Sequence, residues 1–196
     1  DKPFFAYFQL GSPHASVFKL TPEEARQARS NLLEDDELHD PQDAPVPSFV
    51  PATPLFRERM ALFYDAITNM DKQVGELLDK LQAQGLTENT IIVYICDNGW
   101  GSMGRGSVKA SPHELGVRTP IMIKWPGKVA PQMDKINMAS NIDLVPTILA
   151  ACGLKIPKVL PGINLLDYDA VAARKNLFLE CFTHRLLEVV SEALPR

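Results

Sequence analysis

The sequence has few cysteines, no long apolar run and little excess of charge, and each shortage excludes a class of protein. Its three cysteines, Cys96, Cys152 and Cys181, are too few and too scattered for a disulfide framework or a CxxC metal site. No apolar run approaches the roughly 20 residues that a membrane-spanning helix needs. The net charge is −4, from 20 basic and 24 acidic residues. This balance argues against a nucleic-acid partner, because phosphate binding favours a basic surface.

The composition that remains is that of an ordinary globular protein. Hydrophobic residues make up 45% of the 196 residues, and charged residues make up 22%. A chain of this length can bury about 70% of the surface that it exposes when unfolded. We therefore expect a single domain over residues 1–196. The chain begins with Asp1-Lys2-Pro3, without a methionine or a signal peptide, and we expect this start to be an internal boundary.

Hydrophobic periodicity predicts helices and strands in alternation. Apolar residues spaced by four and three from Phe56 to Leu81 predict one long helix, which begins after Thr53 and ends at Gly85. A shorter helix is predicted over residues 141–151. Apolar runs predict buried strands at residues 4–10, 90–96, 120–125 and 176–182. This alternation is typical of an α/β sheet covered by helices.

Residues 14–52 lack a regular apolar pattern and are predicted to form a long loop. Thr21 followed by Pro22 predicts one helical turn inside it, because threonine caps helices and proline suits the first helical position. Acidic residues cluster at 35–40. We interpret this cluster as a solvated surface in preference to a metal site.

Polar residues lie beside the predicted strands at three places. His14 follows the first strand, Asp97-Asn98 directly follows the second, and Lys109 lies in the loop that enters the third. Ligands of open α/β sheets bind at the carboxyl ends of strands. A carboxylate beside an amide carbonyl suits a hard cation such as Ca²⁺ or Mg²⁺, although Asp-Asn-Gly is also a common turn. Two ligands supply only part of the about six to eight oxygens that calcium takes, so a metal site needs further ligands.

The other candidates have both a functional and a structural interpretation. Lys109 could bind a tetrahedral oxyanion as a point charge, or it could be a solvated loop lysine. His14 could donate to an anionic oxygen or protonate a leaving group, or it could be an ordinary loop histidine. We expect Glu114 and Arg118 to pair and brace their loop.

Several short sequence motifs follow one another along the chain in the order that is typical of one protein family. These segments are Phe4 to Phe8 with Pro13-His14; Tyr64-Asp65-Ala66-Ile67 with Met70-Asp71; Asn89 to Val93 with Asp97-Asn98-Gly99; Lys109 to Pro120; Trp125-Pro126-Gly127; and Ile142-Asp143-Leu144-x-Pro146-Thr147. Together they resemble the type I, arylsulfatase-like sulfatases of the alkaline phosphatase superfamily. The resemblance is strongest over residues 1–162 and continues weakly at 177–184.

The resemblance implies a fold and a chemistry. The fold is α/β, with an alkaline-phosphatase-like, mixed and mostly parallel sheet flanked by helices, of which this chain is a partial domain. Asp97 and Asn98 would be ligands of a divalent cation, usually Ca²⁺, with Mg²⁺ as an alternative. Lys109 and His14 would contact the sulfate group. The family's nucleophile is a formylglycine made from the Cys or Ser of a Cys/Ser-x-Pro-x-Arg motif.

The sequence departs from the family pattern at the nucleophile. It contains no Cys/Ser-x-Pro-x-Arg motif and no counterpart of the family's first pair of metal-binding aspartates. We therefore expect a portion of a sulfuric ester hydrolase that is inactive by itself and that pairs with an N-terminal half or another subunit. The expected substrate is a small-molecule or saccharide sulfate ester. The resemblance implies an exported or lysosomal location.

Two alternatives to a sulfatase remain open. One is a phosphate or phosphonate ester hydrolase of the same superfamily, although the segments at 109–120 and 125–127 favour a sulfatase. The other is a non-catalytic remnant or anion-binding protein. A partial sheet should also leave apolar faces and strand edges exposed.

Overall fold

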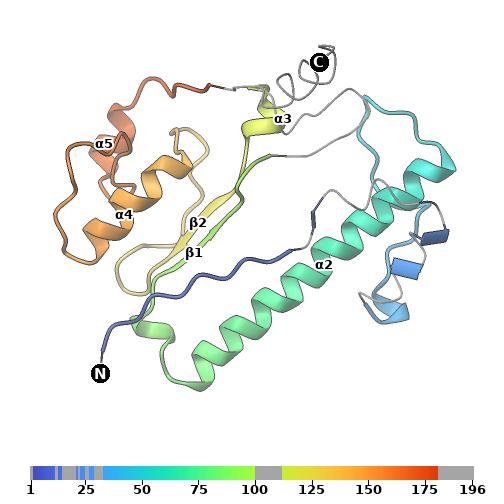
Figure 1. Cartoon of the computed structure of the whole chain (residues 1–196), viewed down its shortest axis with the longest axis horizontal. Coiled ribbons are helices and arrows are strands. Elements are labelled where there is room, and N and C mark those ends of the chain that lie inside the picture. The colour runs from blue at the N-terminus through green and yellow to red at the C-terminus, as the bar shows by residue number, and fades with distance from the viewer. Residues whose placement is uncertain are drawn as a thin grey trace, which may run out of the picture. The chain divides into compact units, whose positions relative to one another are not determined.

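The computed structural model describes residues 2–11, 13–14, 21, 23–24, 27–28, 33–99 and 112–180. Its elements are α2 (Pro54–Ala83), β1 (Ile92–Ile95), α3 (Glu114–Val117), β2 (Ile121–Lys124), α4 (Leu144–Ala151) and α5 (Tyr168–Ala173), with 3-10 turns at Asp35–Glu37, Thr87–Asn89 and Asn141–Asp143 (Figure 1). The described residues up to Thr87 belong to one compact unit, and those from Glu88 onward belong to a second. Among the described helices, none has the length and apolar character needed to cross a membrane.

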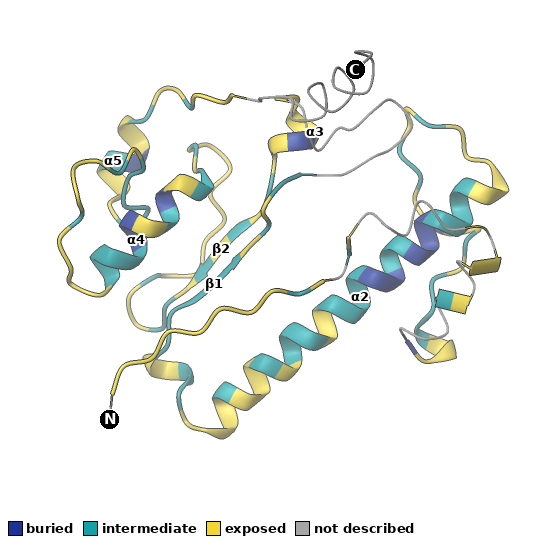
Figure 2. Ribbon diagram, viewed as in Figure 1, coloured by how far each residue is buried: buried dark blue, intermediate teal, exposed yellow. Residues whose placement is uncertain are grey.

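The long helix α2 confirms the helix expected between Thr53 and Gly85. The Thr53 hydroxyl accepts a hydrogen bond from the Phe56 amide at 3.3 Å, and Pro54 occupies the first helical position. Gly85 ends the helix with a φ of 68°, a conformation that glycine adopts without steric cost. Within α2, all the buried residues lie in the N-terminal half of the helix (Figure 2). The apolar stripe therefore continues toward Gly85 with half-buried side chains.

The segment 33–52 is held against α2 by side-chain hydrogen bonds. The Arg57 guanidinium donates to the Gln42 carbonyl at 2.8 Å, and the Tyr64 hydroxyl donates to the Pro45 carbonyl at 3.2 Å. The amide and ring Nδ1 of His39 both lie within 3 Å of a carboxylate oxygen of the fully buried Asp65. The predicted loop is thus ordered here, because α2 supplies partners for its backbone.

Two smaller expectations for residues 14–52 are also met. Thr21 and Glu24 form a reciprocal capping box, which confirms the helical turn. In the acidic cluster, Asp35 and Asp36 are exposed, and Glu37 pairs with Lys72 at 2.8 Å. The cluster is a solvated surface, as expected. The hydrogen bond from Lys72 lowers the pKa of Glu37.

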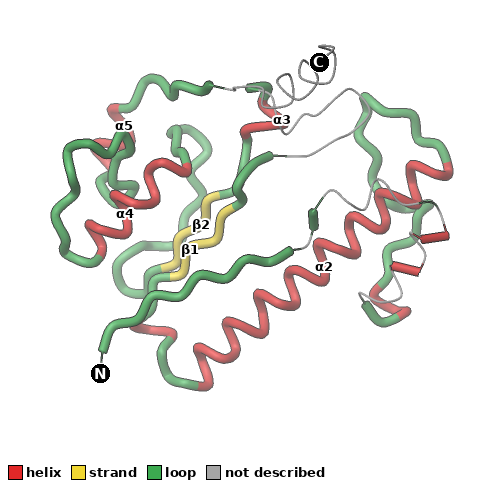
Figure 3. The backbone as a smooth tube through the Cα atoms, in the orientation of Figure 1, coloured by secondary structure: helices red, strands yellow, loops and turns green. Residues whose placement is uncertain are grey.

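In the second unit, β1 and β2 confirm the strands expected at 90–96 and 120–125. They pair antiparallel, with Ile92 opposite Lys124 and Ile95 opposite Ile121 (Figure 3). A mixed sheet accommodates such a pair. Within the described part of the chain this is the one sheet, so none of the parallel neighbours of a mostly parallel sheet lies there.

Two predicted strands are wrong for the residues that the structure describes. Residues 4–10 are neither paired in a sheet nor buried, and Phe5 is 78% exposed. Residues 176–180 form no strand either, and Phe178 is 83% exposed; residues 181–182 lie outside the described part. An apolar run becomes a buried strand only where a neighbouring strand pairs with it. Exposed apolar surface is what a partial sheet was expected to show.

Candidate functional site

The polar turn after β1 is the centre of the candidate site. Asp97 is exposed and Asn98 is half-buried. The side-chain nitrogen of Asn98, Nδ2, donates to the Gly99 carbonyl at 2.9 Å. The side-chain oxygen is therefore the atom that Asn98 can offer to a cation. An exposed carboxylate and an amide oxygen on consecutive residues are hard oxygen donors, and they fit a Ca²⁺ or Mg²⁺ ion as part of its ligand set.

Close packing against α3 holds the far end of this turn. The Gly99 amide donates to the Gly116 carbonyl at 2.9 Å. A Cβ atom at Gly99 would lie 2.3 Å from the Leu115 carbonyl oxygen, so only glycine lets the two backbones approach. Two segments of the family pattern, Asp97-Asn98-Gly99 and the described part of 109–120, are therefore in direct contact in the structure.

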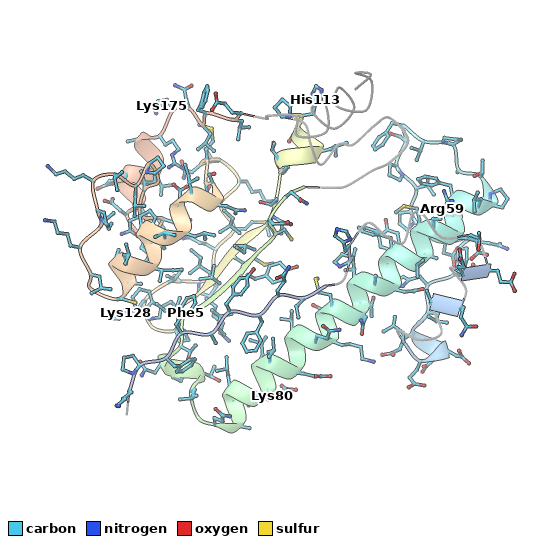
Figure 4. All side chains as sticks on the ribbon, in the orientation of Figure 1. Phe5, Arg59, Lys80, His113, Lys128 and Lys175 are labelled. Atoms are coloured by element: carbon cyan, nitrogen blue, oxygen red, sulfur yellow. The ribbon has the colours of Figure 1, made fainter. Side chains whose placement is uncertain are left out.

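The expected brace between Glu114 and Arg118 is present. Their side chains form an ion pair at 2.7 Å, with both side chains largely exposed. His113 precedes α3 as its N-cap residue (Figure 4). The ion pair braces the short helix α3, whose Gly116 carbonyl accepts a hydrogen bond from the Gly99 backbone amide.

An amide from a distant part of the chain holds the near end of the turn. The Asn141 side chain donates through Nδ2 to the Cys96 carbonyl at 2.9 Å. Asn141 opens the 3-10 turn that leads into α4, and that turn carries a capping box between Ser140 and Asp143. The helix expected at 141–151 is confirmed, with a 3-10 first turn.

A buried ion pair fixes this 3-10 turn. Asp143 has no exposed surface, and its two carboxylate oxygens accept from the Arg174 guanidinium at 2.6 and 2.7 Å. The backbone amides of Ser140 and Ile163 also donate to this carboxylate, at 2.8 and 2.9 Å. The carboxylate is therefore fully hydrogen-bonded, as a buried charge must be. In the sequence Asp143 stands out only as part of a motif and Arg174 does not stand out, because no local pattern joins residues 31 positions apart.

The charge of Asp143 follows from these partners. Burial by itself raises the pKa of Asp143, but the hydrogen bonds from Arg174 and from the Ile163 and Ser140 amides together lower it below the ordinary aspartate value. The same contact raises the pKa of Arg174. Both groups are charged at neutral pH.

This charged state predicts an acid-dependent stability. A carboxylate whose pKa is lower in the folded protein stabilises the fold above its unfolded pKa of about 3.9, and that contribution is lost as the pH falls through the folded pKa. We expect the free energy of unfolding of the wild-type protein to exceed that of Asp143→Asn at pH 7. The difference should shrink below about pH 4. Urea unfolding of both proteins from pH 7 to pH 3 measures it, and a constant difference would contradict the assignment.

The other predicted site residues are placed only in part. His14 belongs to the first unit, is exposed, and donates through its amide to the Gly11 carbonyl at 3.2 Å. Lys109 lies outside the described residues. Asp97 and Asn98 lie together at the end of β1. Within the described ranges, no cluster of three or more histidine, cysteine, aspartate or glutamate residues is placed to hold a metal ion.

Comparisons with known proteins agree with the ordered motifs. The family model for Sulfatase matches residues 1–154. The chain is 28% identical over 167 residues to the endo-4-O-sulfatase of Bacteroides thetaiotaomicron, with 83% of this chain and 32% of that protein covered. It is 30% identical over 186 residues to an ulvan-active sulfatase of Formosa agariphila, with 83% of this chain and 31% of that protein covered.

A solved structure gives the same assignment for the fold. One solved structure comes from work on the metabolism of multiple glycosaminoglycans by Bacteroides thetaiotaomicron. It matches this chain with a TM-score of 0.57 and 25% identity, over 76% of this chain and 32% of its own. The chain spans about a third of the length of the two curated relatives named above. Its fold is part of the alkaline-phosphatase-like α/β fold. With a family model that covers most of its length, the chain belongs to the sulfatase family.

Proposed function

We propose that the protein to which this chain belongs hydrolyses sulfate esters, and that the chain supplies part of its cation and sulfate pocket. The observation that carries this proposal is the Asp97-Asn98 pair, which lies at the end of β1 in a turn anchored at both ends. Family membership makes sulfate the expected anion.

In this proposal the chain's polar residues have separate roles. Asp97 and Asn98 hold a divalent cation, which is Ca²⁺ in this proposal because its flexible coordination sphere suits their oxygens, with Mg²⁺ as the alternative. Lys109 and His14 bind the sulfate oxygens. The cation, when bound, stabilises negative charge on the reacting ester. Fixed charges of this kind act more strongly in a site that excludes water.

The nucleophile is not among these residues. The formylglycine of the family derives from a Cys/Ser-x-Pro-x-Arg motif, which this sequence does not contain. We therefore expect the 196-residue chain alone to show no turnover of an aryl sulfate. Measurable, metal-dependent hydrolysis by the pure chain would contradict this.

The proposed substrate is a sulfated saccharide. One relative is named an ulvan-active sulfatase, and a solved structure is described with the metabolism of glycosaminoglycans, which supports this choice. Hydrolysis rates on a sulfated oligosaccharide and on an aryl sulfate compare the two substrates directly.

The decisive variant is Asp97→Ala in the full-length protein. Loss of a cation ligand removes charge stabilisation, and we expect sulfate ester hydrolysis to fall about 100-fold. Asp134→Ala is the matched control, since Asp134 is an exposed aspartate whose carboxylate accepts hydrogen bonds from Ile136 and Asn137 of its own turn. Full activity of Asp97→Ala, or faster hydrolysis of phosphate esters than of sulfate esters, would reject the proposal.

A further inference from the structure

Two anchors bracket the Asp97-Asn98 pair, one on each side. On the far side, the Gly99 amide donates to the Gly116 carbonyl of α3. On the near side, the Cys96 carbonyl accepts from Asn141 Nδ2 at 2.9 Å. The backbone of both residues thus runs between two fixed points. The first anchor is a backbone contact, whereas the second depends on one side chain.

Asn141 is itself held firmly. It lies between Ser140 and Asp143 of the capping box, and Asp143 is locked by Arg174, which is only 9% exposed. Gly162 packs directly against Ile142, the residue that follows Asn141. A Cβ atom at Gly162 would lie 2.1 Å from the Ile142 carbonyl oxygen. The backbone that carries the Asn141 side chain therefore has little freedom to move.

Packing alone does not explain an asparagine at this position. Among the described residues, the Asn141 Oδ1 atom is buried and has no hydrogen-bond partner. Burying an unpaired amide oxygen is unfavourable, and an apolar side chain of similar size would avoid this penalty. The amide instead provides the donor that reaches the Cys96 carbonyl. An unsatisfied buried group of this kind calls for an explanation beyond stability.

We propose that Asn141 is a positioning residue that fixes the turn after β1, so that Asp97 and Asn98 are presented in one geometry. The buried Asp143–Arg174 pair sets the position of Asn141, and Asn141 sets the position of the Cys96 carbonyl. Residues that orient metal ligands without touching the metal commonly change metal affinity by about 10- to 100-fold. The part of this inference that concerns a cation rests on the proposed function, whereas the ordering of the turn does not.

Hydrogen exchange in the full-length protein tests the ordering. In Asn141→Leu, which keeps the approximate size but has no donor, we expect exchange in the peptide covering residues 96–99 to become about tenfold faster. Asn137→Leu is the matched control: it removes an asparagine that bonds to Asp134 at 2.8 Å within an exposed turn, and it should leave that peptide unchanged. Unchanged exchange at residues 96–99 in a folded Asn141→Leu protein would overturn the inference.

A calcium titration of the same proteins, read by calorimetry, tests the consequence for the cation. We expect Asn141→Leu to bind Ca²⁺ about tenfold more weakly than the wild type and Asn137→Leu to bind it equally well. Equal affinity in all three proteins would overturn the link between Asn141 and the cation. If the wild type binds no Ca²⁺ but Asn141→Leu still exchanges faster, the cation role of Asp97 and Asn98 fails and the ordering role of Asn141 is supported.

A second variant covers the case in which Asn141→Leu does not fold. Asn141→Ala avoids the larger apolar side chain of leucine and has no side-chain hydrogen to donate to the Cys96 carbonyl at any pH. The same faster exchange at residues 96–99 is expected. Wild-type exchange in this variant would overturn the inference.

Discussion

Replacing Arg174 with methionine is expected to lower the free energy of unfolding by about 3–5 kcal/mol, because it leaves the Asp143 carboxylate buried without its counter-charge. Methionine retains much of the apolar stem of arginine, so the effect reports mainly the lost charge. Asp143 has no exposed surface and Arg174 is only 9% exposed, so water cannot replace the guanidinium without opening the fold. Urea unfolding at pH 7 measures the change.

Arg118→Met is the matched control for Arg174→Met. Arg118 also pairs with a carboxylate at 2.7 Å, but its side chain is 79% exposed. Exposed pairs contribute little, so we expect a loss below about 1 kcal/mol. A similar loss in both variants would show that the burial of the Asp143–Arg174 pair is not what makes it important.

Replacing Gly99 with alanine is expected to lower the free energy of unfolding by about 3 kcal/mol and to displace the turn that carries Asp97 and Asn98. The new methyl group would lie 2.3 Å from the Leu115 carbonyl oxygen and within 3 Å of two Gly116 backbone atoms. Since all of these are backbone atoms, no flexible side chain can move aside. The Gly99 to Gly116 hydrogen bond should be lost, and the activity of the full-length protein should fall with it. Thermal unfolding and sulfate ester hydrolysis measure the two effects.

Gly75→Ala is the control that separates crowding from the general effect of adding a methyl group. Gly75 lies inside α2, and a Cβ atom there would meet no other atom within 4 Å. Alanine is favoured over glycine inside a helix by about 1 kcal/mol, so this variant should be more stable than the wild type. Equal stability changes of one sign at Gly75 and Gly99 would reject the close approach of the Asp-Asn-Gly turn to α3.

The elements that have local causes follow from the amino-acid sequence alone. Thr53, Pro54 and Gly85 define the start and the end of α2, because capping and left-handed conformations depend on the residue at that position. The short apolar runs predicted β1 and β2, and the order of the motifs predicted the family. The Asp97-Asn98 pair was found because it directly follows a strand, and this adjacency is a property of the sequence alone.

Which of these elements pair, and which residues hold the candidate site, depends on contacts between distant parts of the chain. The apolar runs at 4–10 and 176–180 have strand composition, yet among the described residues they have no neighbouring strand and stay exposed. Asn141 reaches Cys96 across 45 positions, and Arg174 reaches Asp143 across 31. Strand pairing, close backbone packing and buried ion pairs depend on residues brought together by folding, so no local pattern of residue types specifies them.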